Sequence, residues 1–246
     1  MKTVLVTGAT AGFGEAIAND LLKDHRVIVT GRRRQRLEEK FGSSAGAFLL
    51  PFDVRDKSQV EKAYHTLPEK WKNIDILINN AGLAIGRSFI DSGLREDWDQ
   101  MIDTNVKGLL YVTKTFLPAI KKSECGHIIN IGSIAGKEVY PGGNVYCASK
   151  HAVDALSKAM RMELLSQKIK VTQIRPGLAE TEFSEVRYKG DREKAKKVYE
   201  GYQALLAEDI AHATRFALEQ PPHVCINDLE ITPTAQANAY IIEKND

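Results

Sequence analysis

Residues 4–14 read Val-Leu-Val-Thr-Gly-Ala-Thr-Ala-Gly-Phe-Gly, and this stretch decides the fold. The apolar start at residues 4–6 predicts a short strand, and Ile17, Leu21 and Leu22 mark one side of a helix that follows the glycines. A strand, a glycine loop and a helix N-terminus form a phosphate-binding arrangement, because glycine admits close backbone approach and the helix supplies free N–H groups. The residues expected around the phosphates are Thr7, Gly8, Ala9, Thr10, Ala11, Gly12, Phe13 and Gly14.

The glycine spacing is Gly-x-x-x-Gly-x-Gly, which differs from the Gly-x-Gly-x-x-Gly of the standard dinucleotide fingerprint. The alternative interpretation is a glycine-rich turn that serves folding only. Because the loop directly follows the first strand, we favour phosphate binding.

The segment after the second strand, expected at residues 26–30, decides which dinucleotide the site prefers. In NAD sites an acidic residue about 20 positions after the glycines accepts from the ribose 2′-hydroxyl. Here Gly31-Arg32-Arg33-Arg34 stands at that place, and guanidinium groups suit a 2′-phosphate, which they bind bidentately. We therefore predict NADP, held by Arg32 and Arg33, with Arg34 pointing to water. The alternative is a basic, solvated helix start.

Apolar segments alternate with helical patterns along the whole chain. Strands are expected at residues 4–6, 26–30, 47–52, 74–78, 128–132, 170–174 and 228–232. This alternation predicts an α/β fold, with a parallel seven-stranded sheet and helices on both faces, in a single doubly wound domain spanning residues 1–246. If the first five strands take the order 3-2-1-4-5, the strand at residues 47–52 lies at an edge, where Pro51 is tolerated.

Polar residues follow several of these strands, at the carboxyl ends where open α/β sheets bind ligands. Asp53 and Val54 follow the third strand, and Asp53 either accepts from an adenine amino group or caps a helix that starts near Lys57. Asn79 and Asn80 follow the fourth strand and either approach a ligand or brace neighbouring loops, the latter being a sufficient role for Asn79. The loop after the sixth strand adds Pro176, Gly177 and Thr181.

Tyr146 and Lys150 lie four residues apart on a helix expected from Asn144 to about Leu165, so both side chains share one face. The ammonium favours the phenolate and is expected to lower the pKa of Tyr146 from its reference of about 10. A tyrosine shifted in this way exchanges protons at working pH. Ser133 directly follows the fifth strand. Alone, Tyr-x-x-x-Lys is usually an ordinary surface pair, so the surrounding motifs decide its meaning.

Two further segments bear on the site. The long helix expected at residues 98–117 is apolar on two sides, which predicts burial against the sheet and against a second subunit. Asn105 interrupts the first side and is either a satisfied core amide or part of the site. The charged segment at residues 183–206 follows a ligand-facing loop, which favours a substrate lid over a solvated helix pair.

Composition narrows the classes of function. The net charge of +2 gives no electrostatic case for nucleic acid or membrane partners. Three scattered cysteines form no C-x-x-C, and the six histidines have no metal-ligand spacing, so we expect free thiols in a reducing compartment and no metal. The N-terminal apolar run is too short for a signal peptide and no stretch has the length of a membrane span, so we expect a cytoplasmic protein.

Taken together, the motifs resemble those of the classical short-chain dehydrogenases/reductases over the entire chain. They are Thr7-Gly8-x-x-x-Gly12-x-Gly14, Asn79-Asn80-Ala81-Gly82, Asn105, Ser133, Tyr146-x-x-x-Lys150 and Pro176-Gly177-x-x-x-Thr181. The resemblance implies a Rossmann fold, an NADP-dependent oxidoreductase and a homotetramer, with a dimer as the alternative. It implies that Tyr146 is the catalytic base in alcohol oxidation and the acid in carbonyl reduction. It further implies that Lys150 lowers the tyrosine pKa and holds the nicotinamide ribose, that Ser133 bonds the substrate oxygen, and that Asn105 supports a proton path through Lys150.

Within the family, residues 7–14, 143–146 and 182–191 are similar to the NADP-dependent 3-hydroxy acid dehydrogenases, which implies activity on serine and L-allo-threonine. A 3-hydroxy acid needs a cation for its carboxylate. Our hypothesis is Arg187, in the expected lid, and an exposed arginine without this role is the alternative.

Three other functions remain as alternatives. The first is an NADPH-dependent reductase of bulkier carbonyl compounds. The second is a non-catalytic NADP-sensing regulator, which the presence of both Tyr146 and Lys150 disfavours. The third is a nucleic-acid binder using residues 31–36, which the near-neutral charge and the lack of interleaved aromatic residues disfavour.

Overall fold

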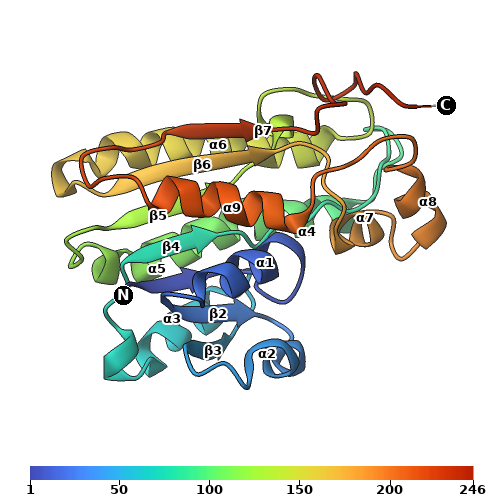
Figure 1. Cartoon of the computed structure of the whole chain (residues 1–246). Helices are drawn as coiled ribbons and strands as arrows, with labels where there is room; N and C mark the ends of the chain where they lie inside the picture. Colours follow the sequence, from blue (N-terminus) through green and yellow to red (C-terminus); the bar gives the residue numbers. More distant parts are fainter. Residues whose placement is uncertain (246) are drawn as a thin grey trace.

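The computed structural model describes residues 1–245 and shows one seven-stranded sheet flanked by helices (Figure 1). The strands are β1 (Thr3–Val6), β2 (Arg26–Gly31), β3 (Ala47–Pro51), β4 (Ile76–Asn79), β5 (His127–Ile131), β6 (Lys170–Pro176) and β7 (Asp228–Ile231). The longer helices are α1 (Gly12–Leu21), α2 (Arg34–Phe41), α3 (Lys57–Thr66), α4 (Arg95–Ile102), α5 (Leu109–Ile120), α6 (Asn144–Glu163) and α9 (Ala207–Leu218). The short helical elements are η1 (Glu69–Trp71), η2 (Asp103–Gly108), η3 (Ile134–Gly136), η4 (Leu165–Gln167), α7 (Glu182–Arg187) and α8 (Arg192–Lys197).

All neighbouring strands pair in parallel, in the order β3-β2-β1-β4-β5-β6-β7. The predicted parallel seven-stranded sheet is therefore confirmed, and so is the order of its first five strands. β3 lies at one edge, where Pro51 is the last residue of the strand and pairs with Gly31. The direction of winding reverses between β1 and β4, which places a crevice at the carboxyl ends of the central strands.

The sheet separates two hydrophobic layers, because successive side chains of a strand point to opposite faces. Leu5 packs with apolar residues of α3, α5 and α6, whereas its neighbours Val4 and Val6 pack with those of α1, α2 and α9. Figure 1 shows α1 and α9 in front of the sheet and α6 behind it. Burial on both faces explains why the central strands are continuous apolar runs.

The helix expected at residues 98–117 is longer and is interrupted. α4 leads into a π-helical turn, η2, before α5 continues to Ile120. A π turn inserts an extra residue into the helical ladder, so residues before and after it do not share one continuous face. The buried residues of this turn include Thr104 and Asn105, and Leu110, on the second predicted side, is 38% exposed.

Asp53 does not cap α3, which corrects one of its two predicted roles. The N-cap is Asp56, whose carboxylate accepts from the backbone N–H groups of Ser58 and Gln59 at 3.0 and 3.1 Å. Asp56 satisfies free donors of the first turn, as N-cap carboxylates do. Asp53 lines the crevice instead.

Within residues 1–245, no helix combines the length and the hydrophobicity required to cross a membrane. The same residues contain no group of three or more His, Cys, Asp or Glu side chains arranged to hold a metal ion.

Candidate active site

A cavity of about 840 Å³ lies at the carboxyl ends of the central strands. It gathers most of the residues predicted to form the site, although they are spread over nearly 180 positions of sequence. The predicted residues that line it are Gly8, Thr10, Ala11, Gly12, Phe13, Arg32, Arg33, Asp53, Val54, Asn80, Ser133, Tyr146, Lys150, Pro176, Gly177, Thr181 and Arg187. Thr7, Ala9, Gly14 and Asn105 lie behind this lining.

The glycine loop is shaped by two positive φ angles and one close approach. Gly8 and Gly12 have φ of 67° and 53°, a conformation that residues with a Cβ rarely adopt. A Cβ at Gly14 would collide with the Gly8 carbonyl oxygen and with the Asn80 side-chain amide. The loop therefore folds tightly over the start of α1, with its backbone toward the cavity.

Thr7 and Asn80 hold this loop to the end of β4. The Thr7 hydroxyl accepts from the backbone N–H groups of Asn80 and Ala81 at 2.9 and 3.0 Å. The Asn80 amide donates back to the Thr7 carbonyl at 2.9 Å. Asn80 thus braces the loop and also lines the cavity, whereas the Asn79 amide donates to Thr113 and Asn130 inside the core. The bracing interpretation holds for Asn79.

Cationic side chains gather where the cavity meets β2 and α2. Arg33 donates to the Thr10 hydroxyl at 3.0 Å, and burial together with the charge of Arg36 lowers the pKa of Arg33. Arg32 lines the same end, whereas Arg34 points away and pairs with Glu38 at the surface. The group of arginines has an excess of positive charge that an anionic ligand would offset.

Asp53 faces this end of the cavity in an ion pair with Arg55, at 2.6 Å. Burial works to raise the pKa of Asp53, but the hydrogen bonds from Arg55 outweigh it, so the pKa lies below its usual range. Asp53 is therefore an ionised acceptor at neutral pH.

Tyr146 and Lys150 both project from α6 into the cavity and both are buried. The Lys150 ammonium lies 5.9 Å from the centre of the Tyr146 ring and donates to the Ile131 carbonyl at 2.9 Å. Burial lowers the pKa of Lys150 to about 8. The four-residue spacing thus places the two side chains together, as predicted.

The predicted depression of the Tyr146 pKa is wrong for the chain by itself. Burial raises the pKa of this phenol, and a hydrogen bond with Ser133 and the charge of Arg187 only partly oppose the rise. The free energy required to remove the phenolate from water exceeds the stabilisation that Ser133 and Arg187 provide. Ser133 meets Tyr146 from the end of β5, where its hydroxyl also accepts from the backbone N–H of Ala135 at 3.1 Å.

Asn105 is a satisfied core amide. Its oxygen accepts from the Leu83 N–H at 2.8 Å, and its nitrogen donates to the Leu83 carbonyl at 2.8 Å and to the Ser149 hydroxyl at 2.9 Å. These bonds tie the π turn to the strand-end loop and to α6. Asn105 lies just behind Gly82, which itself lines the cavity beside Lys150.

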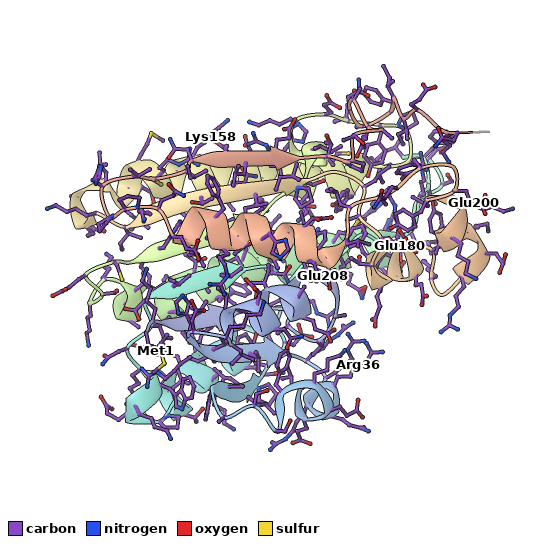
Figure 2. The ribbon with its side chains drawn as sticks, in the orientation of Figure 1. Met1, Arg36, Lys158, Glu180, Glu200 and Glu208 are labelled. Atoms are coloured by element: carbon purple, nitrogen blue, oxygen red, sulfur yellow. The ribbon has the colours of Figure 1, made fainter. Side chains whose placement is uncertain are left out.

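The segment predicted as a lid forms the short helices α7 and α8 (Figure 1), and several of its residues line the cavity. Its lining residues include Phe183, Arg187 and Tyr199, whereas Glu200 projects outward, away from the sheet (Figure 2). The segment is attached to the body of the molecule by the Gly86 N–H, which donates to the Arg187 carbonyl at 2.9 Å, and by a 2.8 Å ion pair between Lys189 and Asp97.

Arg187 lies at the centre of the site. Its guanidinium carbon is 5.7 Å from the centre of the Tyr146 ring and 5.4 Å from that of Tyr140, and Nη2 donates to the Tyr140 hydroxyl at 3.1 Å. The Nε atom is buried and has no hydrogen-bond partner. The alternative of an exposed arginine is therefore wrong.

Several residues of the cavity were not predicted. Tyr140 lies in the turn just before α6, and nothing in the local sequence indicates its contact with Arg187. Arg87 and the C-terminal residues Gln236, Tyr240 and Lys244 also line the cavity. The Gln236 side chain accepts from the Leu178 N–H at 2.8 Å and so joins the C-terminal segment to the loop after β6.

Comparisons with known proteins agree with this geometry. Residues 2–192 match the model of the short chain dehydrogenase family. The chain is 48% identical over 239 residues to the NADP-dependent 3-hydroxy acid dehydrogenase YdfG of Escherichia coli K12, covering 96% of both chains. It is 41% identical over 239 residues to the serine 3-dehydrogenase of Agrobacterium fabrum, again covering 96% of both.

A solved structure is similar over nearly the whole molecule. The closed form of a serine dehydrogenase complexed with NADP⁺ superposes with a TM-score of 0.94 at 46% identity, covering 99% of this chain and 100% of the other. The serine dehydrogenase from Escherichia coli gives a TM-score of 0.83 at 42% identity, covering 96% and 99%.

Proposed function

Because this chain belongs to the short-chain dehydrogenase family, we propose that it is an oxidoreductase that transfers a hydride between NADP and a small 3-hydroxy acid of the serine or L-allo-threonine type. The observation that supports this proposal best is the meeting of Tyr146, Ser133 and Arg187 in one cavity. A proton-transfer group, a donor for the substrate oxygen and a cation for a carboxylate are the three parts that a hydroxy acid requires.

The residues at one end of the cavity fit NADP. Gly8, Gly12 and other residues of the glycine loop line the cavity, and the adjoining N-terminus of α1 favours the pyrophosphate. Arg32 and Arg33 supply the charge for the 2′-phosphate, and Asp53 supplies an acceptor for the adenine amino group. When bound, NADP supplies the nicotinamide that takes up or returns the hydride.

Tyr146 accepts the hydroxyl proton of the substrate in oxidation and returns it in reduction. Since burial raises the pKa of Tyr146, the phenol is protonated in the isolated chain and is ready to act as the acid. Action as the base requires that positive charge be brought closer to the phenolate oxygen. The Lys150 ammonium on the same helix face and the Arg187 guanidinium are the two cations near enough to supply it.

Ser133 and Arg187 position the substrate between them. The Ser133 hydroxyl bonds the reacting oxygen next to Tyr146, and Arg187 binds the carboxylate, so that the carbon between these groups is held in place. Asn105 fixes the backbone of Leu83 and the hydroxyl of Ser149, and through these contacts supports a proton path at Lys150. The lid formed by residues 183–206 excludes water once the substrate is bound, a role supported by the similarity to a closed, NADP⁺-bound relative.

The experiment that tests this function follows the absorbance of NADPH formed from NADP and L-serine or L-allo-threonine, with NAD as the control cofactor. Turnover with NADP is expected, and Tyr146→Phe should abolish it while NADP binding persists. Arg187→Ala should lower kcat/KM for the acids. Activity on neutral carbonyl compounds with none on any 3-hydroxy acid would reject the substrate class and favour the reductase of bulkier carbonyls.

We further propose a homotetramer in the cytoplasm. Apolar side chains exposed on consecutive helices support an association surface: Leu110 of α5 is 38% exposed and Met162 of α6 is 73% exposed. Light scattering during size-exclusion chromatography measures the molar mass of the assembly. The mass of a monomer would refute the proposal.

A further inference from the structure

The Arg187 side chain is half-buried, and its guanidinium has an incomplete set of hydrogen-bond partners. It offers five N–H donors, of which one is bonded to Tyr140, while the buried Nε has none. No carboxylate among residues 1–245 forms an ion pair with it. A half-buried cation with unpaired N–H donors and no carboxylate partner is suited to an anion that a ligand brings.

Tyr140 is itself fixed by the turn that precedes α6. The Gly143 N–H donates to the Tyr140 carbonyl at 3.0 Å, and Gly142 takes a φ of 75°. The Tyr140 ring covers Gly143 so closely that a Cβ there would collide with it. Burial raises the pKa of Tyr140, so the phenol stays neutral, and its oxygen accepts from Arg187.

The backbone of α7 does not fix the guanidinium on its own. The bond between the Gly86 N–H and the Arg187 carbonyl anchors the main chain, but an arginine side chain has many rotamers beyond it. Tyr140 is the hydrogen-bonding side chain that holds the far end of Arg187 in place, by the bond to Nη2 and by the ring face beneath the guanidinium. The same guanidinium lies over the Tyr146 ring.

We propose that Tyr140 is a positioning residue that holds Arg187 above Tyr146 and thereby makes the site selective for carboxylate substrates. This inference rests on the function proposed above. Its physical basis is pre-organisation: a rotamer fixed before binding does not have to be fixed by the substrate. The competing explanation is that Tyr140 only packs the turn at Gly143.

Tyr140→Phe separates these two explanations, because it keeps the ring against Gly143 and removes only the hydroxyl. The expected result is a rise of about tenfold in KM for L-serine, the lower end of the effect of a hydrogen bond to a charged group, with kcat nearly unchanged. L-serinamide, which has the same carbon skeleton without the carboxylate, should show no change in kcat/KM. The KM for NADP should also stay constant.

Tyr111→Phe is the matched control, since Tyr111 lies on α5 outside the cavity. This substitution should leave the kinetic constants for both L-serine and L-serinamide unchanged. Tyr140→Phe should add little to the loss of L-serine activity in an Arg187→Ala background, because the two residues act as one unit. Full additivity in that double variant would show independent effects and reject the positioning role.

The outcomes distinguish this inference from the proposed function. If the unmodified enzyme oxidises L-serine, Arg187→Ala impairs it and Tyr140→Phe has no effect, only the positioning role is refuted. Equal losses on L-serine and L-serinamide would also refute it, since packing of the turn explains them. If the unmodified enzyme acts on no 3-hydroxy acid, both the proposed function and this inference are wrong.

Discussion

Lys150→Met should stabilise the protein in the absence of cofactor while it removes the catalytic activity. The pKa of Lys150 falls from 10.5 to about 8 because the ammonium is buried. At about 1.36 kcal/mol per pKa unit, the charged amine costs the fold ~3 kcal/mol at neutral pH. The substitution also removes the hydrogen bond to the Ile131 carbonyl, which reduces the gain in stability by ~1 kcal/mol. The net stabilisation is therefore ~2 kcal/mol.

The sign of the pH dependence follows from the direction of the shift. Because the folded-state pKa of Lys150 is the lower one, the unfolded chain holds a proton between pH 8 and 10.5 that the folded chain has released. The wild-type protein therefore gains stability as the pH rises through this window, and the penalty is complete only below it. The advantage of Lys150→Met should be largest near pH 7 and should vanish toward pH 10.5.

Thermal unfolding of the two proteins between pH 7 and 10 measures this difference, and subtraction cancels the titration of groups that both share. A gain of ~2 kcal/mol corresponds to a rise in Tm of about 4–8 °C for a chain of this size. Lys114→Met, at an exposed position on α5, is the control and should change stability by less than about 0.5 kcal/mol. A Lys150→Met protein that is less stable than the wild type, or an advantage independent of pH, would refute the reasoning.

Two further predictions concern the cofactor end of the cavity. Gly14→Ala adds a Cβ that collides with the Gly8 carbonyl and the Asn80 amide, so NADPH titration followed by fluorescence should show at least a tenfold loss of affinity, about 1.4 kcal/mol; binding at wild-type strength would contradict the close approach. Arg33→Ala removes a cation beside Thr10 and should raise the KM for NADP by about 10- to 100-fold without changing that for NAD, as expected for a charged hydrogen bond. Arg34→Ala, which breaks only a surface pair, is the matched control, and equal effects of the two variants would reject the role of Arg33.

The sheet could be predicted because its signals are local. Residues 4–6 and 76–78 are short apolar runs, and each needs burial on both faces of the sheet to be stable. The expected order of the first five strands put the strand with Pro51 at an edge, and the sheet order bears this out. The spacing of Tyr146 and Lys150 likewise required only the geometry of a helix.

The unpredicted features depend on contacts between distant segments. The π turn around Asn105 does not interrupt the apolar pattern of the sequence, so the pattern predicts one continuous helix. Asn105 bonds to Leu83 and Ser149, which lie 22 and 44 residues away. The Tyr146 pKa depends on how much protein covers the phenol, which no spacing reveals. Tyr140 meets Arg187 across 47 residues, and only the folded chain brings them together.

The attachment of the chain end to the lid bears on how the protein should be produced. The Asn245 N–H donates to the Gly201 carbonyl at 2.7 Å, and the Lys244 ammonium lies 5.7 Å from the Tyr202 ring centre. An affinity tag fused behind these residues would disturb the segment that we propose as the substrate lid. Met1 is 89% exposed at the other end of the molecule (Figures 1 and 2), so a tag placed there leaves the kinetic constants undisturbed.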